Sequence, residues 1–309
     1  MQALLDRCPT GSPDELAGSG IQRQGTSAAR DAGDTPAMAD TIVVVPCYNE
    51  ADRLPVESFK RYAATARGIR FLFVDDGSRD RTLEVLRGLE AERPDAFRVL
   101  ALPHNAGKAE AVRRGVLAGL EAGARYVGFW DADLSTPLEA IGDLRAVMEA
   151  KPGIEAVFGS RVQLLGRAIE RHAWRHYLGR VFATAASLTL RLRVYDTQCG
   201  AKLFRASDRL AELFRDPFCA RWIFDVELIA RMIRQRRGTA LPGAESVIYE
   251  FPLLEWRDVP GSKLKARDFA RAALDLARIY RVYLRAGAPP SSAASPAQPR
   301  LLPHGVSPA

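Results

Sequence analysis

Short apolar runs alternate with segments of helix length through the middle of this chain, and this order limits the folds that it can adopt. The strand-like runs are residues 41–46, 69–75, 97–102, 125–131 and 154–160. Their apolar residues are consecutive, which is typical of strands buried on both faces of a parallel sheet. Right-handed crossovers then place helices on both sides of the sheet. We therefore expect a doubly wound α/β fold, with a mostly parallel sheet and helices on both faces.

Helix-like segments follow the first four of these runs, and two of the helices have marked starts. Ser78 is a suitable N-cap for the helix that follows residues 69–75. Pro137, directly after Thr136, suits the first position of a later helix because its missing N–H is not needed there. The sequence thus predicts helix starts at these two positions.

Low-complexity segments flank the alternating region at both ends. Residues 1–39 are rich in Gly, Ala, Ser and Asp, and residues 286–309 are rich in Pro, Ala and Ser. Segments of such composition bury too little apolar surface to offset the entropy cost of ordering. We expect a disordered leader over 1–39, a folded domain over 40–285 and a disordered tail over 286–309.

The net charge of +7 indicates an anionic partner, such as a nucleotide, a phospholipid surface or a nucleic acid. The four cysteines form no CxxC pair, so we expect free thiols in a reducing compartment. The first forty residues contain no apolar signal-peptide core, and no apolar run has the length of a membrane span. The predicted location is the cytoplasm, with peripheral attachment to the cytoplasmic membrane face as a possibility.

Polar groups end four of the predicted strands, at what should be a single edge of the sheet. These strand ends are PCYNE (46–50), DDGS (75–78), DAD (131–133) and GSR (159–161). A capped turn explains any one of them, but ligands of doubly wound sheets bind beyond the carboxyl ends of the strands. The carboxylates of Asp131 and Asp133 repel each other unless a cation lies between them or water solvates both. Mg²⁺ or Mn²⁺ takes oxygen ligands and commonly uses one or two carboxylates.

Over roughly residues 41–265 the sequence resembles the GT-A glycosyltransferases of family 2. The donor-side segments that carry the resemblance are TIVVVPCYNEADRL, FVDDGSRDRT, LPHNAGKAEAVRRG and DADLSTP. The later segments DTQCGAKLF, WIFDVELIARM and GSKL are similar to the polyprenyl-phosphate branch, above all the dolichyl-phosphate β-glucosyltransferases, with the dolichol-phosphate mannosyltransferases also similar. The resemblance implies a GT-A fold, with a nucleotide-sugar half over about 40–135 and an acceptor half over 136–285.

Two positions depart from the family pattern. Ala109 follows Lys108 where the family usually has Gly, and Ser135 stands where some relatives place a third metal ligand. The third ligand of a bound metal is therefore left open.

The resemblance implies an inverting, metal-dependent enzyme that moves a hexose, most simply glucose from UDP-glucose, onto a polyprenyl or dolichyl phosphate in β linkage. Asp133 would be the firmer ligand of Mg²⁺ or Mn²⁺, and Asp131 would share the metal or the ribose. The nucleotide sugar would also contact the following residues, carried over from the same motifs: Pro46, Tyr48, Glu50, Asp75, Asp76, Lys108, Ser262 and Lys263.

Each donor-side residue has an expected role. Asp75 and Asp76 would face the nucleoside, with Asp76 at the base. Pro46 and Tyr48 would form the apolar wall beside the base, and Lys108 would reach the diphosphate or ribose. Glu50 either fixes its loop or compensates the charge at a helix start. Ser262 and Lys263 would close over the diphosphate as part of a mobile loop.

On the acceptor side, Asp225 in WIFDVEL lies at the position of the family's catalytic base. A hydroxyl acceptor requires such a base. A lipid phosphate is already an anionic nucleophile, so Asp225 would then orient a cation or the substrate. Arg161 and Lys202 are the cations expected to face the acceptor phosphate.

Residues 161–195 hold seven arginines and a single acid, Glu170, which nearly accounts for the net charge of the chain. Within them a helix is expected over about 170–193, with an apolar stripe at helical spacing: Trp174, Leu178, Val181, Ala185, Leu188 and Leu192. Such a helix can lie in a bilayer interface, or its stripe can pack on the sheet as core.

Two other functions stay open. A family 2 enzyme with a hydroxyl acceptor, either a glycan or a small molecule, keeps the donor chemistry and makes Asp225 a true base. A non-catalytic basic protein could bind nucleic acid through its arginines, but it leaves the DAD and DDGS strand ends without a purpose. We therefore expect a nucleotide-sugar donor and a polyprenyl-phosphate acceptor as ligands, and no nucleic acid.

Overall fold

A computed structural model of the protein describes residues 40–170, 173–259 and 266–285. The predicted leader over 1–39 and tail over 286–309 lie outside this range, and so do Ser262 and Lys263.

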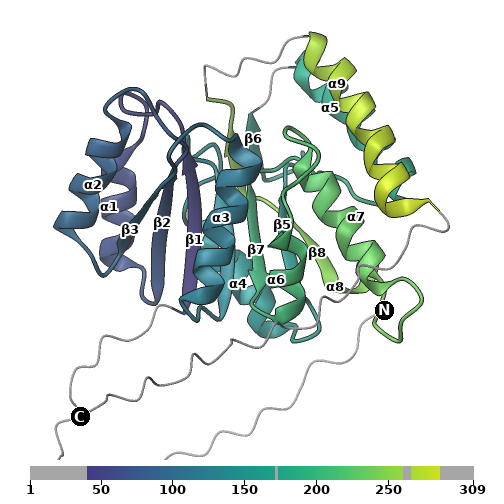
Figure 1. Cartoon of the computed structure of the whole chain (residues 1–309), viewed down its shortest axis with the longest axis horizontal. Helices are drawn as coiled ribbons and strands as arrows, with labels where there is room; N and C mark the ends of the chain where they lie inside the picture. The colour runs from purple at the N-terminus through teal and green to yellow at the C-terminus, as the bar shows by residue number, and fades with distance from the viewer. Residues whose placement is uncertain (1–39, 171–172, 260–265, 286–309) are drawn as a thin grey trace, which may run out of the picture. The chain divides into compact units, whose positions relative to one another are not determined.

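A seven-stranded sheet forms the centre of the fold, in the order β3-β2-β1-β4-β7-β5-β8 (Figure 1). Its strands are β1 (Thr41–Cys47), β2 (Ile69–Asp75), β3 (Phe97–Ala101), β4 (Tyr126–Trp130), β5 (Ala156–Ser160), β7 (Ala201–Arg205) and β8 (Ile248–Pro252). All neighbouring strands pair in parallel except β7, which runs antiparallel to both β4 and β5. The mostly parallel, doubly wound sheet predicted from the sequence is confirmed.

Helices cover both faces of this sheet (Figure 1). The helices on one face are α1 (Val56–Thr65), α2 (Thr82–Glu92) and α4 (Ala140–Ala150). Those that contribute to the core on the other face are α3 (Lys108–Glu121), α5 (Ala173–Leu190), α6 (Asp208–Arg215), α7 (Phe224–Arg236) and α9 (Ala266–Ile279). The short helix α8 (Ala244–Val247) precedes β8, and a π-helical turn, η1 (Tyr280–Leu284), extends α9.

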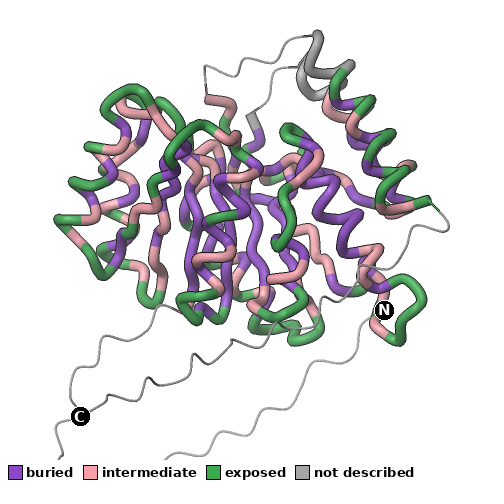
Figure 2. Tube along the Cα trace, in the orientation of Figure 1, coloured by how far each residue is buried: buried purple, intermediate pink, exposed green. Residues whose placement is uncertain are grey.

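Alternate side chains of each strand supply the two core layers. In β1, Ile42 and Val44 belong to the layer under α3, whereas Val43 and Val45 belong to the layer under α1. All four are at most 3% exposed, because strand side chains point to opposite faces in turn and both faces are covered. Figure 2 shows the central strands as the largest continuous buried region.

A second, two-stranded sheet lies next to the loop that follows β4. It pairs β6 (Ala168–Glu170) in parallel with β9 (Glu255–Arg257). The backbone N–H of Arg257 donates to the carbonyl of Ser135 at 2.9 Å. This bond fastens the far side of the loop over residues 131–136.

Three predicted helix boundaries were wrong. Helix α2 begins at Thr82, and the carboxylate of Asp80, not Ser78, accepts its first N–H at 3.0 Å. Helix α4 begins at Ala140 instead of Pro137, because residues 137–139 form separate turns. Helix α5 covers less than 170–193, since the chain leaves the helix at Arg191 with φ 53°.

Helix α5 also divides the expected apolar stripe. Ala185 and Leu192 of the stripe pack partly against the core, beside the buried Ala186 and Leu190, which the stripe did not include. The side chains of Trp174 and Leu178 lie outside the described part of the chain. Val181 and Leu188 are 68% and 74% exposed. One face of the helix therefore packs as core while another face presents apolar groups to solvent. Among the described residues, no helix combines the length and the apolar character needed to cross a bilayer.

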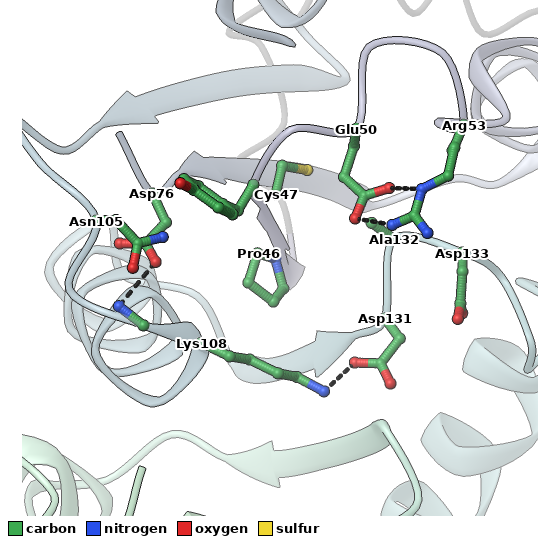
Figure 3. A pocket seen from close by; sticks show the side chains of 12 residues that line it. Pro46, Cys47, Glu50, Arg53, Asp76, Asn105, Lys108, Asp131, Ala132 and Asp133 are labelled. Atoms are coloured by element: carbon green, nitrogen blue, oxygen red, sulfur yellow. Dashed lines mark hydrogen bonds and ion pairs between the residues drawn. The ribbon is translucent and has the colours of Figure 1, made fainter. Parts of the chain in front are cut away.

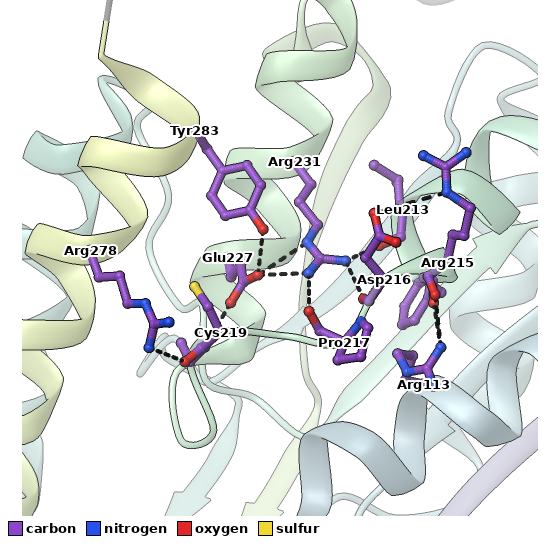
Figure 4. Close-up of polar contacts among 12 residues, drawn as sticks. Arg113, Leu213, Arg215, Asp216, Pro217, Cys219, Glu227, Arg231, Arg278 and Tyr283 are labelled. Carbon is purple, nitrogen blue, oxygen red and sulfur yellow. Dashed lines mark hydrogen bonds and ion pairs between the residues drawn. The ribbon is translucent and has the colours of Figure 1, made fainter. Parts of the chain in front are cut away.

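Buried polar contacts connect α7, η1 and the loop before α7 (Figure 4). Glu227, fully buried in the first turn of α7, accepts from the Tyr283 hydroxyl at 2.9 Å and from the Arg231 guanidinium at 2.8 Å. Arg231 also donates to the carbonyls of Leu213, Asp216 and Pro217. Glu227 of the WIFDVEL segment thus serves packing and not the substrate site.

Candidate active site

The polar strand ends meet at one edge of the sheet, as predicted. The carboxyl ends of β1, β2, β4 and β5 point to this edge because the four strands run the same way. The antiparallel β7 begins there, with Ala201 paired to Trp130. The segment DTQCG before β7 is thereby placed beside the DAD loop.

A pocket of about 340 Å³ opens at this edge (Figure 3). Its lining residues are Pro46, Cys47, Tyr48, Glu50, Arg53, Asp76, Asn105, Gly107, Lys108, Asp131, Ala132 and Asp133. Seven of the predicted site residues are among them: Pro46, Tyr48, Glu50, Asp76, Lys108, Asp131 and Asp133. Arg53 and Asn105 were missed. Arg53 stands three residues after Glu50 and pairs with it, a spacing that could have identified it.

The loop after β4 presents both of its aspartates to this pocket. Leu134 takes a left-handed conformation with φ 51°, and its N–H donates to the carbonyl of Asp131 at 3.2 Å. The Trp130 indole N–H donates to the carbonyl of Thr136 at 2.9 Å and closes the loop from behind. Asp133 is exposed, and one of its oxygens accepts from the N–H of Ser135. Ser135 itself is therefore a backbone partner of Asp133.

Lys108, the first residue of α3, reaches across the pocket, and its ammonium contacts Oδ1 of Asp131 (Figure 3). The side chains of Lys108 and Asp131 are 44% and 34% exposed. Burial alone would lower the pKa of Lys108, but the carboxylates of Asp131 and Asp225 outweigh it and raise that pKa. Lys108 is therefore a firmly charged ammonium beside the DAD loop.

Asp75 and Asp76, expected at the nucleoside, are both 2% exposed. The carboxylate of Asp76 accepts the N–H groups of Ala106 and Gly107, each at 2.8 Å, so it holds the loop that leads into α3. Its side chain still forms part of the pocket wall, whereas Asp75 lies behind the wall. Gly77, at φ 64°, permits this packing, because a Cβ there would lie 2.5 Å from the backbone of His104.

Glu50 and Arg53 form an ion pair at the rim of the pocket. The Arg53 guanidinium donates to both carboxylate oxygens of Glu50, at 2.6 and 3.0 Å. This bidentate hydrogen bond and the charge of Glu50 raise the pKa of Arg53. The pairing supports the role of Glu50 in fixing its loop.

Lys202 was expected to face a phosphate, and its position contradicts that expectation. Its side chain is fully buried, and its ammonium lies 2.6 Å from the Asp225 carboxylate and donates to the carbonyl of Cys199 at 2.6 Å. The rings of Phe129 and Phe158 flank it at 5.2 Å each. Its place on β7 directs it into the core beneath the site, so it supports the site from below.

Asp225 lies in the first turn of α7 and is 6% exposed. Burial raises its pKa, against the opposing charges of Lys202 and Lys108. The carboxylate thus lies between two ammonium groups, one beneath the site and one in the pocket. This placement suits a group that orients cations better than a base that must meet a substrate hydroxyl.

Arg161, at the end of β5, already has a carboxylate partner. Its guanidinium donates to the Asp196 carboxylate at 2.6 and 2.7 Å and lies over the Trp256 ring. The Glu250 carboxylate in turn accepts the N–H of Asp196 at 2.9 Å. Arg161 is therefore held in place by a chain of contacts from β8, and its side chain is 14% exposed.

Gly200 is a further site residue that motif reading did not single out. A Cβ at this position would lie 2.0 to 2.6 Å from the carboxylate atoms of Asp131, so any side chain here would displace that carboxylate. The N–H of Asp131 also donates to the carbonyl of Gly200 at 3.0 Å. The missing side chain of Gly200 provides the space in which the Asp131 carboxylate lies.

The pocket fits a hard divalent cation in the chemistry of its donors. Within the described residues there is no group of three or more His, Cys, Asp or Glu side chains that could hold a metal. Asp131 and Asp133 nevertheless both line the pocket. One or two carboxylates are enough for Mg²⁺ or Mn²⁺ when substrate phosphates and water complete the coordination.

A second hollow, of about 550 Å³, lies between α5 and the segment that follows it. Its walls combine apolar and basic side chains: Arg180, Ala183, Thr184, Ser187, Leu188, Arg191, Leu192, Arg193, Val194, Tyr195 and Glu250. Tyr195 and Glu250 adjoin Asp196, the partner of Arg161. The hollow is therefore connected by direct contacts to the end of β5.

Comparison with known sequences places this site in a family. Residues 42–209 match the family described as Glycosyl transferase family 2. A dolichyl-phosphate beta-glucosyltransferase of Trichomonas vaginalis is 31% identical over 265 residues, which cover 82% of this chain and 74% of that protein. The Drosophila melanogaster protein of the same name is 33% identical over 248 residues, covering 75% of this chain and 71% of that protein.

Solved structures share the fold at low sequence identity. The mannosyltransferase PcManGT of Pyrobaculum calidifontis, in complex with GDP-Man and Mn²⁺, has a TM-score of 0.50 at 17% identity, over 79% of this chain and 64% of that one. Glucosyl-3-phosphoglycerate synthase of Mycobacterium tuberculosis, in complex with UDP, has a TM-score of 0.51 at 19% identity, over 79% of this chain and 81% of that one. The expected GT-A fold is thereby confirmed.

Proposed function

Because this chain belongs to glycosyl transferase family 2, we propose that it transfers glucose from a nucleotide-diphosphate donor to the phosphate of a dolichyl or related polyprenyl lipid. The product is a β-linked lipid-phosphate sugar. The observation that carries the proposal is the pocket in which Asp131, Asp133 and Lys108 meet at the carboxyl edge of the sheet. The names of the relatives support the choice of glucose and of the acceptor.

Donor binding uses the walls of this pocket. Pro46 and the 39% exposed Tyr48 offer apolar surface to the nucleoside. Asp76 fixes the loop that carries Lys108, and Asn105 on the same loop adds a polar group to the wall. No single contact in the pocket identifies the nucleotide. The choice of UDP is supported by the glucosyltransferase names of the relatives.

Asp131 and Asp133 would hold Mg²⁺ or Mn²⁺, which supplies charge neutralisation at the diphosphate when bound. The Mn²⁺ complex of the similar mannosyltransferase fold supports divalent metal use. The residues of this chain then act on the departing diphosphate by position and charge. Lys108 is the pocket cation that can turn toward it, and Arg53 stands at the rim.

A phosphate acceptor needs no proton removed, because its oxygen is already anionic at neutral pH. The burial of Asp225 and its contact with Lys202 support this acceptor over a hydroxyl compound. In this proposal Asp225 orients Lys108 and Lys202, and Arg161 is held by Asp196 at the edge where the acceptor arrives. Ser262 and Lys263, which the sequence predicts to contact the donor, lie outside the described residues.

The lipid acceptor requires access to a membrane, and α5 offers the surface for it. Val181 and Leu188 expose apolar side chains there, and Arg191 and Arg193 follow directly. Basic residues near an anionic leaflet contribute about 1 kcal/mol each. We include peripheral attachment through α5 in the proposed function.

The test is an assay that pairs UDP-glucose, UDP-N-acetylglucosamine and GDP-mannose with a short polyprenyl phosphate and Mn²⁺ or Mg²⁺. We expect metal-dependent glucosyl lipid, abolished in Asp133→Ala. Asp52→Ala is the matched control, because Asp52 is an exposed carboxylate in the loop after β1 and does not line the pocket. Hydrolysis of the donor without lipid product would refute the proposal that the acceptor is a lipid phosphate. The absence of turnover with every donor would refute the proposed glycosyl transfer.

A further inference from the structure

We propose that Lys108 is an internal counter-ion that competes with the divalent cation for Asp131, and that it becomes available to the donor diphosphate when the cation takes its place. The proposal rests on the proposed function for the identity of that donor. It assigns Lys108 two alternative partners, a carboxylate in the donor-free protein and a phosphate in the donor complex.

The first support is the contact itself. The ammonium of Lys108 touches Oδ1 of Asp131, an oxygen that is closed to solvent and receives no hydrogen bond from any other described residue. An anionic oxygen that is shielded from water requires a neighbouring positive charge. Lys108 provides that charge at the oxygen that a metal would otherwise neutralise.

The second support is the charge balance of the pocket. Glu50, Asp76, Asp131 and Asp133 line it, against two lining cations, Arg53 and Lys108. Arg53 is held by both oxygens of Glu50, and Asp76 is satisfied by two backbone N–H groups. Lys108 is therefore the lining cation that contacts Asp131.

The third support is the exposure of Lys108, which leaves its side chain room to change partners. Lys108 is 44% exposed, and its unbranched side chain carries a point charge that needs no fixed fork geometry. A partly exposed ion pair of this type is weak enough to be replaced by a bound cation. The buried Lys202, held by Asp225 and Cys199, lacks this freedom.

Binding of Mn²⁺ alone, followed by electron paramagnetic resonance of the free ion, tests the competition without any turnover. Lys108→Met should bind Mn²⁺ about three- to fivefold more tightly than the wild type in the absence of nucleotide, the upper part of the range expected for releasing a partly exposed pair. Arg79→Met is the control of equal charge change, because Arg79 is exposed at the same edge but does not line the pocket. Its Mn²⁺ affinity should stay within about twofold of the wild type, as expected for screened surface charge.

A double-mutant cycle separates direct competition from a long-range charge effect. In an Asp131→Asn background, Lys108→Met should change Mn²⁺ affinity by less than about twofold, because the contested carboxylate is gone. An equal gain in both backgrounds would overturn the proposal, and so would the absence of any gain in the single variant. A wild type that binds no Mn²⁺, with or without UDP, would overturn it as well.

Affinity for UDP completes the test. Lys108→Met should weaken UDP binding when Mn²⁺ is present and leave it unchanged when Mn²⁺ is absent, because Lys108 then still faces Asp131. Equal weakening under both conditions would show that Lys108 faces the phosphate at all times and would refute the exchange. These measurements use no acceptor, so failure of the lipid assay and failure of this inference are distinguishable.

Discussion

The ammonium of Lys202 lies 2.6 Å from the carboxylate of Asp225, and neither side chain is more than 8% exposed. A strand of the central sheet and the first turn of a helix are thus joined by opposite charges under the active site. Burial of such an ion pair costs free energy. Removal of only one of its charges costs far more, because the other charge is then buried without a partner.

Lys202→Met should therefore lower the free energy of unfolding by about 3–5 kcal/mol, because Asp225 is left buried without its nearest counter-charge. Urea denaturation measures the loss. Lys202→Met combined with Asp225→Asn removes both charges and should recover most of it. A double variant no more stable than Lys202→Met would show that the two side chains are not energetically coupled.

Gly200→Ala should reduce kcat/KM by about a hundredfold or more, since a displacement of the reacting groups by about 1 Å has effects of this size. The added methyl group would occupy the space of the Asp131 carboxylate. The protein should remain folded by circular dichroism, which separates a misplaced carboxylate from a collapsed fold.

Gly88→Ala is the matched control for this substitution. Gly88 lies in α2, and a Cβ there would have no neighbour within 4 Å. Alanine should raise helix stability by up to about 1 kcal/mol and leave the activity unchanged. Full activity in Gly200→Ala would mean that Asp131 does not need its observed position.

The Cys219 thiol should resist alkylation in the folded protein. Burial, together with the Glu227 carboxylate, raises the pKa of Cys219 to about 12. At about pH 8.5 the thiolate is therefore rare in the folded chain but common in the unfolded one, and iodoacetamide should react at least about a hundredfold more slowly with the former. Mass spectrometry of the Cys219 peptide, with and without concentrated urea, measures both rates.

The same pKa makes stability depend on pH with a defined sign. The folded pKa lies above the unfolded one, so Cys219 favours the folded state fully below about pH 8.5 and loses that contribution as the pH rises toward 12. Alkylation rates of Cys219 within tenfold of each other in the folded and unfolded protein would contradict a half-buried thiol beside the Glu227 carboxylate.

Val181→Asp together with Leu188→Asp should weaken sedimentation with anionic liposomes by about tenfold or more, because each change removes exposed apolar surface and adds repulsion. Ala64→Asp with Thr65→Asp carries the same charge change on α1, which covers the other face of the sheet. The α1 variant should sediment like the wild type. Equal sedimentation of the α5 and α1 variants would show that α5 is not the surface that binds the membrane.

Much of the fold was predictable because its signals are local. Consecutive buried apolar residues placed β1 and β2 to within one residue of their observed ends. Helix starts were less predictable, since Ser78 and Pro137 have suitable residue types but Asp80 and the turns over 137–139 determine where the helices begin. Strand β7 was not predicted, because its antiparallel place depends on contacts with strands far away in the sequence.

The site shows the same division between local and distant causes. Residue type and position at a strand end were enough to bring Asp131, Asp133 and Lys108 into one pocket. The burial of Lys202 and the engagement of Arg161 by Asp196 follow from β7 and the segment before it, so no local pattern could reveal them. Gly200 was hidden for a similar reason, since its need to lack a side chain arises from Asp131 across the sheet.

The insertion of β7 between β4 and β5 has a consequence for synthesis on the ribosome. One edge of β4 has no partner until residues 201–205 have emerged, about 75 residues after β4 itself, which at ordinary translation rates takes about 4–15 s. During that interval the nascent chain exposes the free hydrogen-bonding groups of a hydrophobic strand. The order of the strands therefore leaves the first half of the sheet with an open edge until β7 has been made, so the complete sheet forms late in translation.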